Sequence, residues 1–119
     1  MKITILGCGG SFGSPLAWNR HGNIDLENKR NFRTRSSVLI EYKNTNILID
    51  TSPDLRQQLL KAKINYLDGV IFTHSHADHM HGIDDLRMIF FKRKSRIPIW
   101  GNFETVSYTH LTLPTMLWV

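Results

Sequence analysis

Cysteine is nearly absent from this chain, since Cys8 is the only one in 119 residues. A single thiol cannot form an internal disulfide, which fits a reducing compartment. Long apolar runs are missing too, because no stretch approaches the roughly 20 residues that a membrane helix requires. Residues 1–4 lead straight into a strand pattern, without the apolar segment of a signal peptide. We therefore expect a cytoplasmic protein that has no membrane partner.

The common nucleotide-binding loops are also absent. Residues 7–15 are rich in glycine, yet they lack the Gly-Lys-Ser/Thr ending of a phosphate-binding loop, and no helical pattern follows them. This glycine-rich segment is therefore neither a Walker loop nor a dinucleotide-binding loop.

The chain has no strong charge excess, with a net charge of +5, 41% hydrophobic residues and 21% charged residues. These values fit one small globular domain. The positive residues form two groups, Arg30 with Arg33 and Arg35, and Lys92 with Arg93, Lys94 and Arg96. Such groups are typical of solvated faces, but they also make anionic substrates plausible. Aromatic residues do not interleave with the second group, so a nucleic-acid partner is not favoured.

Alternating and helical apolar patterns indicate a mixed α/β fold. We expect a first strand near residues 3–6, a hairpin of strands 37–42 and 46–50, a strand over 67–72, and an edge strand over 96–101. A helix should begin at Ser52 as N-cap, with Pro53 in its first turn and Asp54 facing the positive end of the helix dipole. A second helix should span 83–91, with Asp84 and Asp85 in its first turn. Residues 16–35 should form a long loop that covers a site.

The most informative motif is the segment 73–79, Thr-His-Ser-His-Ala-Asp-His, directly after the strand expected over 67–72. His74 and His76 are two residues apart, so in extended backbone their rings point to one side and can bind one cation. Asp78 and His79 follow the bend and can bind a second cation. The alternative is an incidental polar surface loop.

This spacing resembles the metallo-β-lactamase superfamily. Residues 67–72 are similar to the strand that delivers that family's metal loop, and residues 46–54 to its preceding strand and turn. Residues 81–87 resemble a segment of one branch, the phosphodiesterases related to phosphoribosyl 1,2-cyclic phosphate hydrolase. The resemblance covers about residues 1–104 and implies the N-terminal half of an αββα sandwich, which would leave one sheet face exposed.

The resemblance also implies roles for individual residues. His74, His76, Asp78 and His79 would hold two divalent ions, zinc or manganese, with a bridging hydroxide as nucleophile. Asp78 would be catalytic as well, by orienting the water when one metal is present. Asp50 would brace the metal loop by hydrogen bonds.

Neighbouring segments leave alternatives open. The glycine-rich segment would lie beside the active-site rim, or would simply be a tight turn. The cysteine cluster that often holds a structural zinc in that branch is missing. His81 is near enough to contact substrate, although the family's ligand pattern does not use that position.

The function implied is a metal-dependent hydrolase that cleaves a phosphodiester, a cyclic one included, in a small-molecule phosphate ester. One alternative is a nuclease like the tRNA 3′-processing enzymes, because these share the motif and the chain is basic. Another is a non-catalytic metal-binding module. A homodimer of the full-length parent is an additional expectation.

Residues 105–119 contain no Asp, Glu, Lys or Arg and match nothing in the family. They resemble translated sequencing-adapter read-through; the alternative is a genuine β-strand broken by Pro114. The family's third His, bridging Asp and last His would all lie beyond residue 119. We therefore expect this chain by itself to bind metal weakly and to have little activity.

Overall fold

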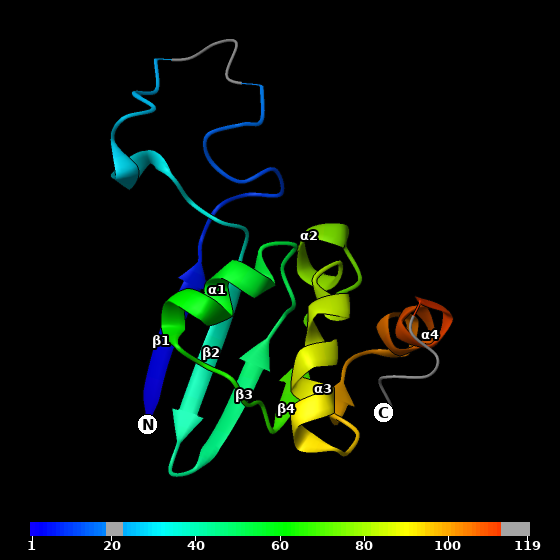
Figure 1. Ribbon diagram of the computed structural model, residues 1–119. Coiled ribbons are helices and arrows are strands. Elements are labelled where there is room, and N and C mark those ends of the chain that lie inside the picture. The colour runs from blue at the N-terminus through cyan, green and yellow to red at the C-terminus, as the bar shows by residue number, and fades with distance from the viewer. Residues whose placement is uncertain (19–22, 113–119) are drawn as a thin grey trace.

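The computed structural model describes residues 1–18 and 23–112, which form one mixed sheet with helices on one of its faces (Figure 1). The strands are β1 (Lys2–Gly7), β2 (Ser37–Tyr42), β3 (Thr45–Ile49), β4 (Gly69–Ile71) and β5 (Ile99–Trp100). The helices are α1 (Leu55–Ala62), α2 (Ala77–Met80), α3 (Arg87–Arg93) and α4 (Phe103–Thr112), with short 3₁₀ turns η1 (Lys29–Asn31) and η2 (Ile83–Leu86). The mixed α/β class predicted from the sequence is confirmed.

The sheet has the order β1-β2-β3-β4-β5. β1, β2 and β3 pair antiparallel, whereas β3, β4 and β5 pair parallel. Two parallel strands need a crossover between them, and α1 provides it from β3 to β4. The carboxyl ends of β3 and β4 therefore meet at one edge of the sheet, and the segment 73–79 begins there.

One face of the sheet carries the core. The register aligns Leu39, Leu48, Val70 and Ile99 across β2 to β5, and all four are buried. Side chains from the helical layer pack against them, namely Leu55, Leu59, Leu86 and Ile89. Each buried leucine or isoleucine contributes about 1.5–3 kcal/mol to folding.

The opposite face is apolar but uncovered by the described residues. Ile5, Ile71 and Trp100 belong to one row across the strands and are 68%, 40% and 52% exposed. Ile3, in the neighbouring row, is 60% exposed. The prediction that one sheet face stays exposed is confirmed for the part of the chain described here.

The start of α1 differs from the prediction. Residues 53–54 form a turn, the helix begins at Leu55, and Asp54 rather than Ser52 is its N-cap. Asp54 makes no capping hydrogen bond, because its carboxylate binds Arg35 instead. The Ser52 hydroxyl accepts a hydrogen bond from the Asp54 backbone N–H at 3.1 Å and so stabilises the turn.

The second predicted helix is divided. Residues 83–86 form the 3₁₀ turn η2, with Asp84 and Asp85 in its first turn as expected, and α3 follows directly. β5 lies at the edge of the sheet formed by the described residues, as predicted, but it spans only residues 99–100 of the expected 96–101.

The last described segment is helical. Residues 103–112 form α4, so the alternative of a genuine β-strand is wrong for these residues. The division at residue 104 stays a prediction, and residues 113–119 lie outside the described part of the chain. No helix among the described residues is long and apolar enough to span a bilayer.

Candidate metal centre

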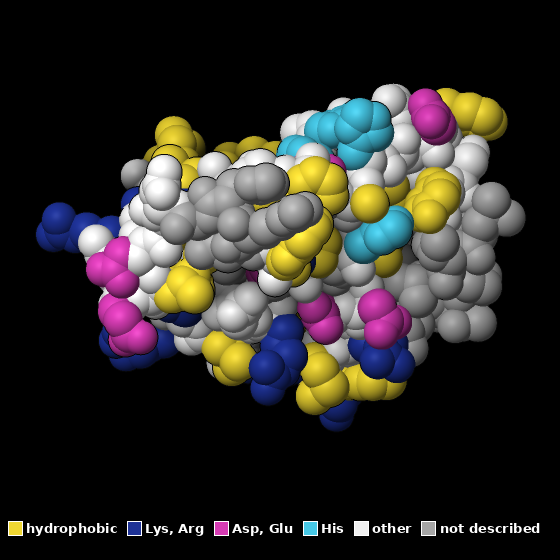
Figure 2. All heavy atoms as spheres, turned by 90° about the horizontal axis from the view of Figure 1, so that it is seen from above, with side chains coloured by type: hydrophobic (Ala, Val, Ile, Leu, Met, Phe, Trp, Pro, Cys, Tyr) yellow, Lys and Arg dark blue, Asp and Glu magenta, His cyan; other side chains and the backbone are white. Residues whose placement is uncertain are grey.

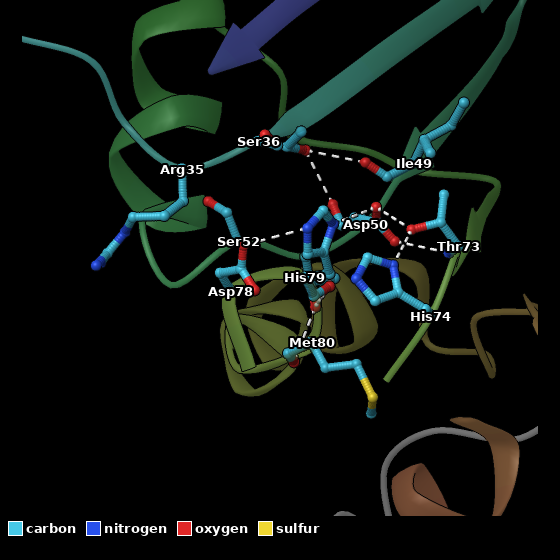
Figure 3. A network of polar contacts seen from close by, with 12 residues as sticks. Arg35, Ser36, Ile49, Asp50, Ser52, Thr73, His74, Asp78, His79 and Met80 are labelled. Atoms are coloured by element: carbon cyan, nitrogen blue, oxygen red, sulfur yellow. Dashed lines mark hydrogen bonds and ion pairs between the residues drawn. The ribbon is translucent and has the colours of Figure 1, made fainter. Parts of the chain in front are cut away.

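Asp50 is the organising residue of the edge where β3 and β4 end (Figure 3). It directly follows β3, is 4% exposed and adopts a positive φ of 63°, a conformation that Asp tolerates better than most residues. Its carboxylate accepts hydrogen bonds from the Thr73 backbone N–H at 2.8 Å and the Thr73 hydroxyl at 2.7 Å. The predicted bracing of the loop by Asp50 is thus confirmed.

The same carboxylate orients a histidine. Asp50 Oδ2 lies 2.7 Å from His79 Nδ1, so that ring nitrogen is occupied by the brace. Nε2 of His79 is the remaining nitrogen, and it faces Asp78 Oδ2 at 3.2 Å. A carboxylate that holds the far nitrogen of a ligating histidine fixes its tautomer and its direction.

The loop backbone is also tied to the residues after β3. The Thr51 N–H donates to the His79 carbonyl at 2.9 Å, and the Thr51 hydroxyl donates to the Met80 carbonyl at 3.0 Å. The Gly82 N–H returns a hydrogen bond to the Thr51 carbonyl at 3.1 Å. These contacts hold the short helix α2, which carries Asp78 and His79, against the end of β3.

His74 and His76 complete the cluster. The ring centroids of His74 and His76 are 4.5 Å apart, and those of His74 and His79 are 4.1 Å apart. Nδ1 of His74 lies 2.9 Å from the Thr73 hydroxyl, which leaves its Nε2 for another partner. The structure therefore brings the predicted histidines together.

The side chains of the cluster are suitable ligands for divalent cations, but they are too few to complete a site. Imidazole and carboxylate are ligands of zinc and manganese, and two such ligands of one ion lie about 3.0–3.4 Å apart for bond lengths near 2.1 Å. The Asp78–His79 distance of 3.2 Å falls in this range. No group of three or more His, Cys, Asp or Glu side chains in residues 1–18 and 23–112 is placed to hold an ion. Each ion would need donors in addition to the pair proposed for it.

Ser11 is a contact that the sequence analysis missed. Its hydroxyl donates to Asp78 Oδ2 at 3.3 Å, although the two residues are 67 positions apart. The glycine-rich segment therefore lies beside the metal loop, as the rim interpretation predicted. The glycines around Ser11 were the available signal, but they did not indicate which side chain would reach the site.

Other candidates lie apart from this cluster. The His81 ring stacks on Tyr108 of α4 at a centroid distance of 6.3 Å and an interplanar angle of 13°. Asp84 binds Arg87 at 3.0 Å in an exposed pair. Neither contact involves the three histidines of the metal loop.

Arg35 and Asp54 form a second polar feature that the sequence did not reveal. Asp54 accepts hydrogen bonds from Arg35 Nε at 2.7 Å, from Arg35 Nη2 at 3.1 Å and from the Arg35 backbone N–H at 2.9 Å. Burial by itself raises the pKa of Asp54, but these hydrogen bonds and the positive charge of Arg35 outweigh it, so the pKa is lowered. The pair fastens the loop before β2 to the start of α1.

This chain is similar in sequence to several known proteins. The family described as "Beta-lactamase superfamily domain" matches residues 45–115. An octanoyltransferase of Porphyromonas gingivalis is 44% identical over 95 residues, which are 79% of this chain and 19% of that protein. A ribonuclease Z of Methanosarcina acetivorans is 32% identical over 115 residues, 93% of this chain and 32% of that protein.

The fold is also similar to that of a solved diphosphatase of the PhnP family. The TM-score is 0.81 at 33% identity, and the match covers 94% of this chain and 45% of the diphosphatase. The chain thus spans less than half the length of each of these three proteins.

Proposed function

This chain belongs to the beta-lactamase superfamily domain family, and from that premise we propose that it supplies the metal loop of a divalent-metal-dependent phosphodiesterase. The carrying observation is the convergence of His74, His76 and His79 beside Asp78, with His79 oriented by Asp50. A relative named diphosphatase and one named ribonuclease Z support hydrolysis of phosphate esters.

In this proposal His74 and His76 hold one ion and Asp78 and His79 the other, with zinc or manganese as the native metal. When bound, such ions act as Lewis acids and lower the pKa of water to about 7. Asp50 holds the His79 ring so that Nε2 points to the site, and Asp78 would orient a water molecule when only one metal is present.

The favoured substrate is a small phosphodiester, cyclic ones included. A ribonuclease is the second candidate, because the ribonuclease Z match extends over 93% of this chain. The two candidates can be distinguished by measuring RNA affinity at several salt concentrations. If RNA binds through several phosphate groups, its affinity falls steeply as the ionic strength rises.

The test compares two histidines of the same loop, His79→Ala and His81→Ala, in a protein of the relatives' length. Zinc content and hydrolysis of bis-nitrophenyl phosphate are measured together. We expect His79→Ala to lower turnover by more than about 100-fold and to lose metal, because loss of an outer partner alone costs about 10–100-fold. His81→Ala should retain both properties, since its ring contacts Tyr108 instead.

Unchanged metal content in His79→Ala would show that the loop is not the binding site. Bound metal without turnover, with zinc and with manganese, would instead support the non-catalytic metal-binding module. For the 119-residue chain itself we expect weak zinc binding, and tight binding of two ions would refute this expectation.

A further inference from the structure

An open cavity of about 870 Å³ lies beside α1, apart from the histidine cluster. Its walls come from the end of β1, the glycine-rich segment with Ala17 after it, Lys29, residues 32–35, and α1 with Asp54 before it. In Figure 2 the largest group of histidines lies at the upper border, whereas Lys and Arg side chains lie mainly along the left and lower borders. On the face shown there, most positive side chains lie away from this largest group of histidines.

The charge of this cavity is unbalanced. Four cationic side chains line it, Lys29, Arg33, Arg35 and Lys61, and Asp54 is the one carboxylate in the described lining. Arg35 is neutralised because it binds Asp54 at 2.7 Å. Within the described part of the chain, no carboxylate lies within 4.0 Å of the charged nitrogens of Lys29, Arg33 or Lys61.

The Arg35–Asp54 pair and the hydrogen bonds of Gln58 together hold the cavity wall in place. Gln58 of α1 donates hydrogen bonds to the Arg35 carbonyl and to the Thr34 hydroxyl, both at 2.9 Å. The segment that carries Arg33 is thereby fixed to the helix that carries Lys61. A site whose charges are held in place before binding loses less conformational entropy when an anion enters.

We propose that this cavity binds a phosphate group of the substrate through Lys29, Arg33 and Lys61. The link to the metal loop is the glycine-rich segment, because Ser11 contacts Asp78 and the next residue, Phe12, lines the cavity. A phosphodiester bound at the metal loop would reach this cavity with a second phosphate group next to the one that is hydrolysed. This inference rests on the proposed function and narrows its substrate to a phosphodiester with a second phosphate group, carried either by an oligophosphate chain attached to a small molecule or by an RNA strand.

The test measures binding to the metal-free 119-residue chain with two probes, inorganic tripolyphosphate and a single-stranded eight-nucleotide oligouridylate. The variant is Lys29→Gln with Lys61→Gln. Its matched control is Lys92→Gln with Lys94→Gln, which removes the same charge from the end of α3 and from its C-cap. Equal urea midpoints of the two variants verify that neither change has unfolded the protein.

We expect the cavity variant to bind its probe about tenfold more weakly, and the control to change by less than about twofold. For RNA, the slope of log K against log salt should fall by about 1.4, since each single-strand phosphate contact contributes about 0.7. Binding of tripolyphosphate alone identifies an oligophosphate ligand, and binding of the oligonucleotide identifies an RNA strand.

Equal losses in the two variants would overturn the proposal, because they would reflect general attraction to a basic protein. Failure of both probes to bind would overturn it as well. Neither result bears on the metal centre, since the measurement contains no metal and the His79→Ala test does not involve the cavity.

Discussion

Asp54 illustrates how the surroundings of one residue decide its role. From the sequence it is a helix-start carboxylate, yet it accepts three hydrogen bonds from Arg35, which is 19 positions away. Both side chains are mostly buried, with exposed fractions of 26% for Arg35 and 15% for Asp54. Removing either partner would leave an unpaired charge in a mostly buried position, which would destabilise the folded state.

The lowered pKa of Asp54 predicts a specific pH dependence. The unfolded carboxyl has a pKa of about 3.9, and the folded one lies lower, so its stabilising contribution is complete above about pH 5. It is lost as the pH falls below the unfolded pKa and through the folded pKa. We expect Asp54→Asn to lower the free energy of unfolding by about 1.5–3 kcal/mol at pH 6, and by much less at pH 3.

Urea unfolding between pH 3 and pH 6 measures this difference. Asp84→Asn is the matched control, because Asp84 pairs with Arg87 while 54% exposed and surface pairs contribute little. A constant difference between wild type and Asp54→Asn across this pH range would contradict the assignment.

At the scale of elements, the backbone at the start of η2 packs very closely against the turn before α1. A Cβ atom at Gly82 would lie 1.8 Å from the Ser52 carbonyl oxygen. This close approach lets the Gly82 N–H reach the Thr51 carbonyl and keeps α2 against β3. The metal loop thus depends on a glycine outside the ligand motif.

We therefore expect Gly82→Ala to destabilise the fold by about 1–3 kcal/mol, the usual cost of overpacking. Thermal or urea unfolding measures the loss. Gly10→Ala is the control, since nothing lies within 4 Å of a Cβ at that position. Similar stabilities of the two variants would show that this close packing can relax.

The same scale shows why some boundaries were mispredicted. Ser52 and Pro53 have the composition of a helix start, but the helix begins at Leu55, and the Asp54 carboxylate at its N-cap binds Arg35 instead of capping. The helix predicted over 83–91 is divided between η2 and α3, although its apolar positions Ile83, Leu86 and Ile89 are buried as the pattern requires. The apolar periodicity predicted which side chains are buried, but it did not predict the helix boundaries.

At the scale of the whole molecule, the uncovered sheet face dominates the expected solution behaviour. Among the described residues, the row through Ile5 continues with Val38, Ile49, Ile71 and Trp100 and has no charged side chain, and the row through Ile3 contains further isoleucines. Exposed apolar patches of this kind bind other apolar surfaces. In an αββα sandwich this face would contact the second sheet.

We expect the 119-residue chain to bind the dye ANS and to self-associate as its concentration rises. Ile5→Thr should weaken both effects, because Ile5 is 68% exposed on this face. Dye fluorescence and analytical ultracentrifugation measure them. Leu26→Thr is the control, since Leu26 is 54% exposed in the loop before η1. A monomer that does not bind the dye would contradict the prediction.

The sequence by itself determined the mixed α/β class and the approximate positions of the strands, and it singled out the histidine-rich segment 73–79, because alternation, helical spacing and residue motifs are local patterns. It also predicted the bracing role of Asp50, through the resemblance of residues 46–54 to a known segment. Only the tertiary structure decided that Ser11 contacts Asp78, that His81 turns to Tyr108 and that Arg35 binds Asp54. Each of these contacts joins residues at least 19 positions apart, and their pairing is fixed by how the loops and helices pack on the sheet.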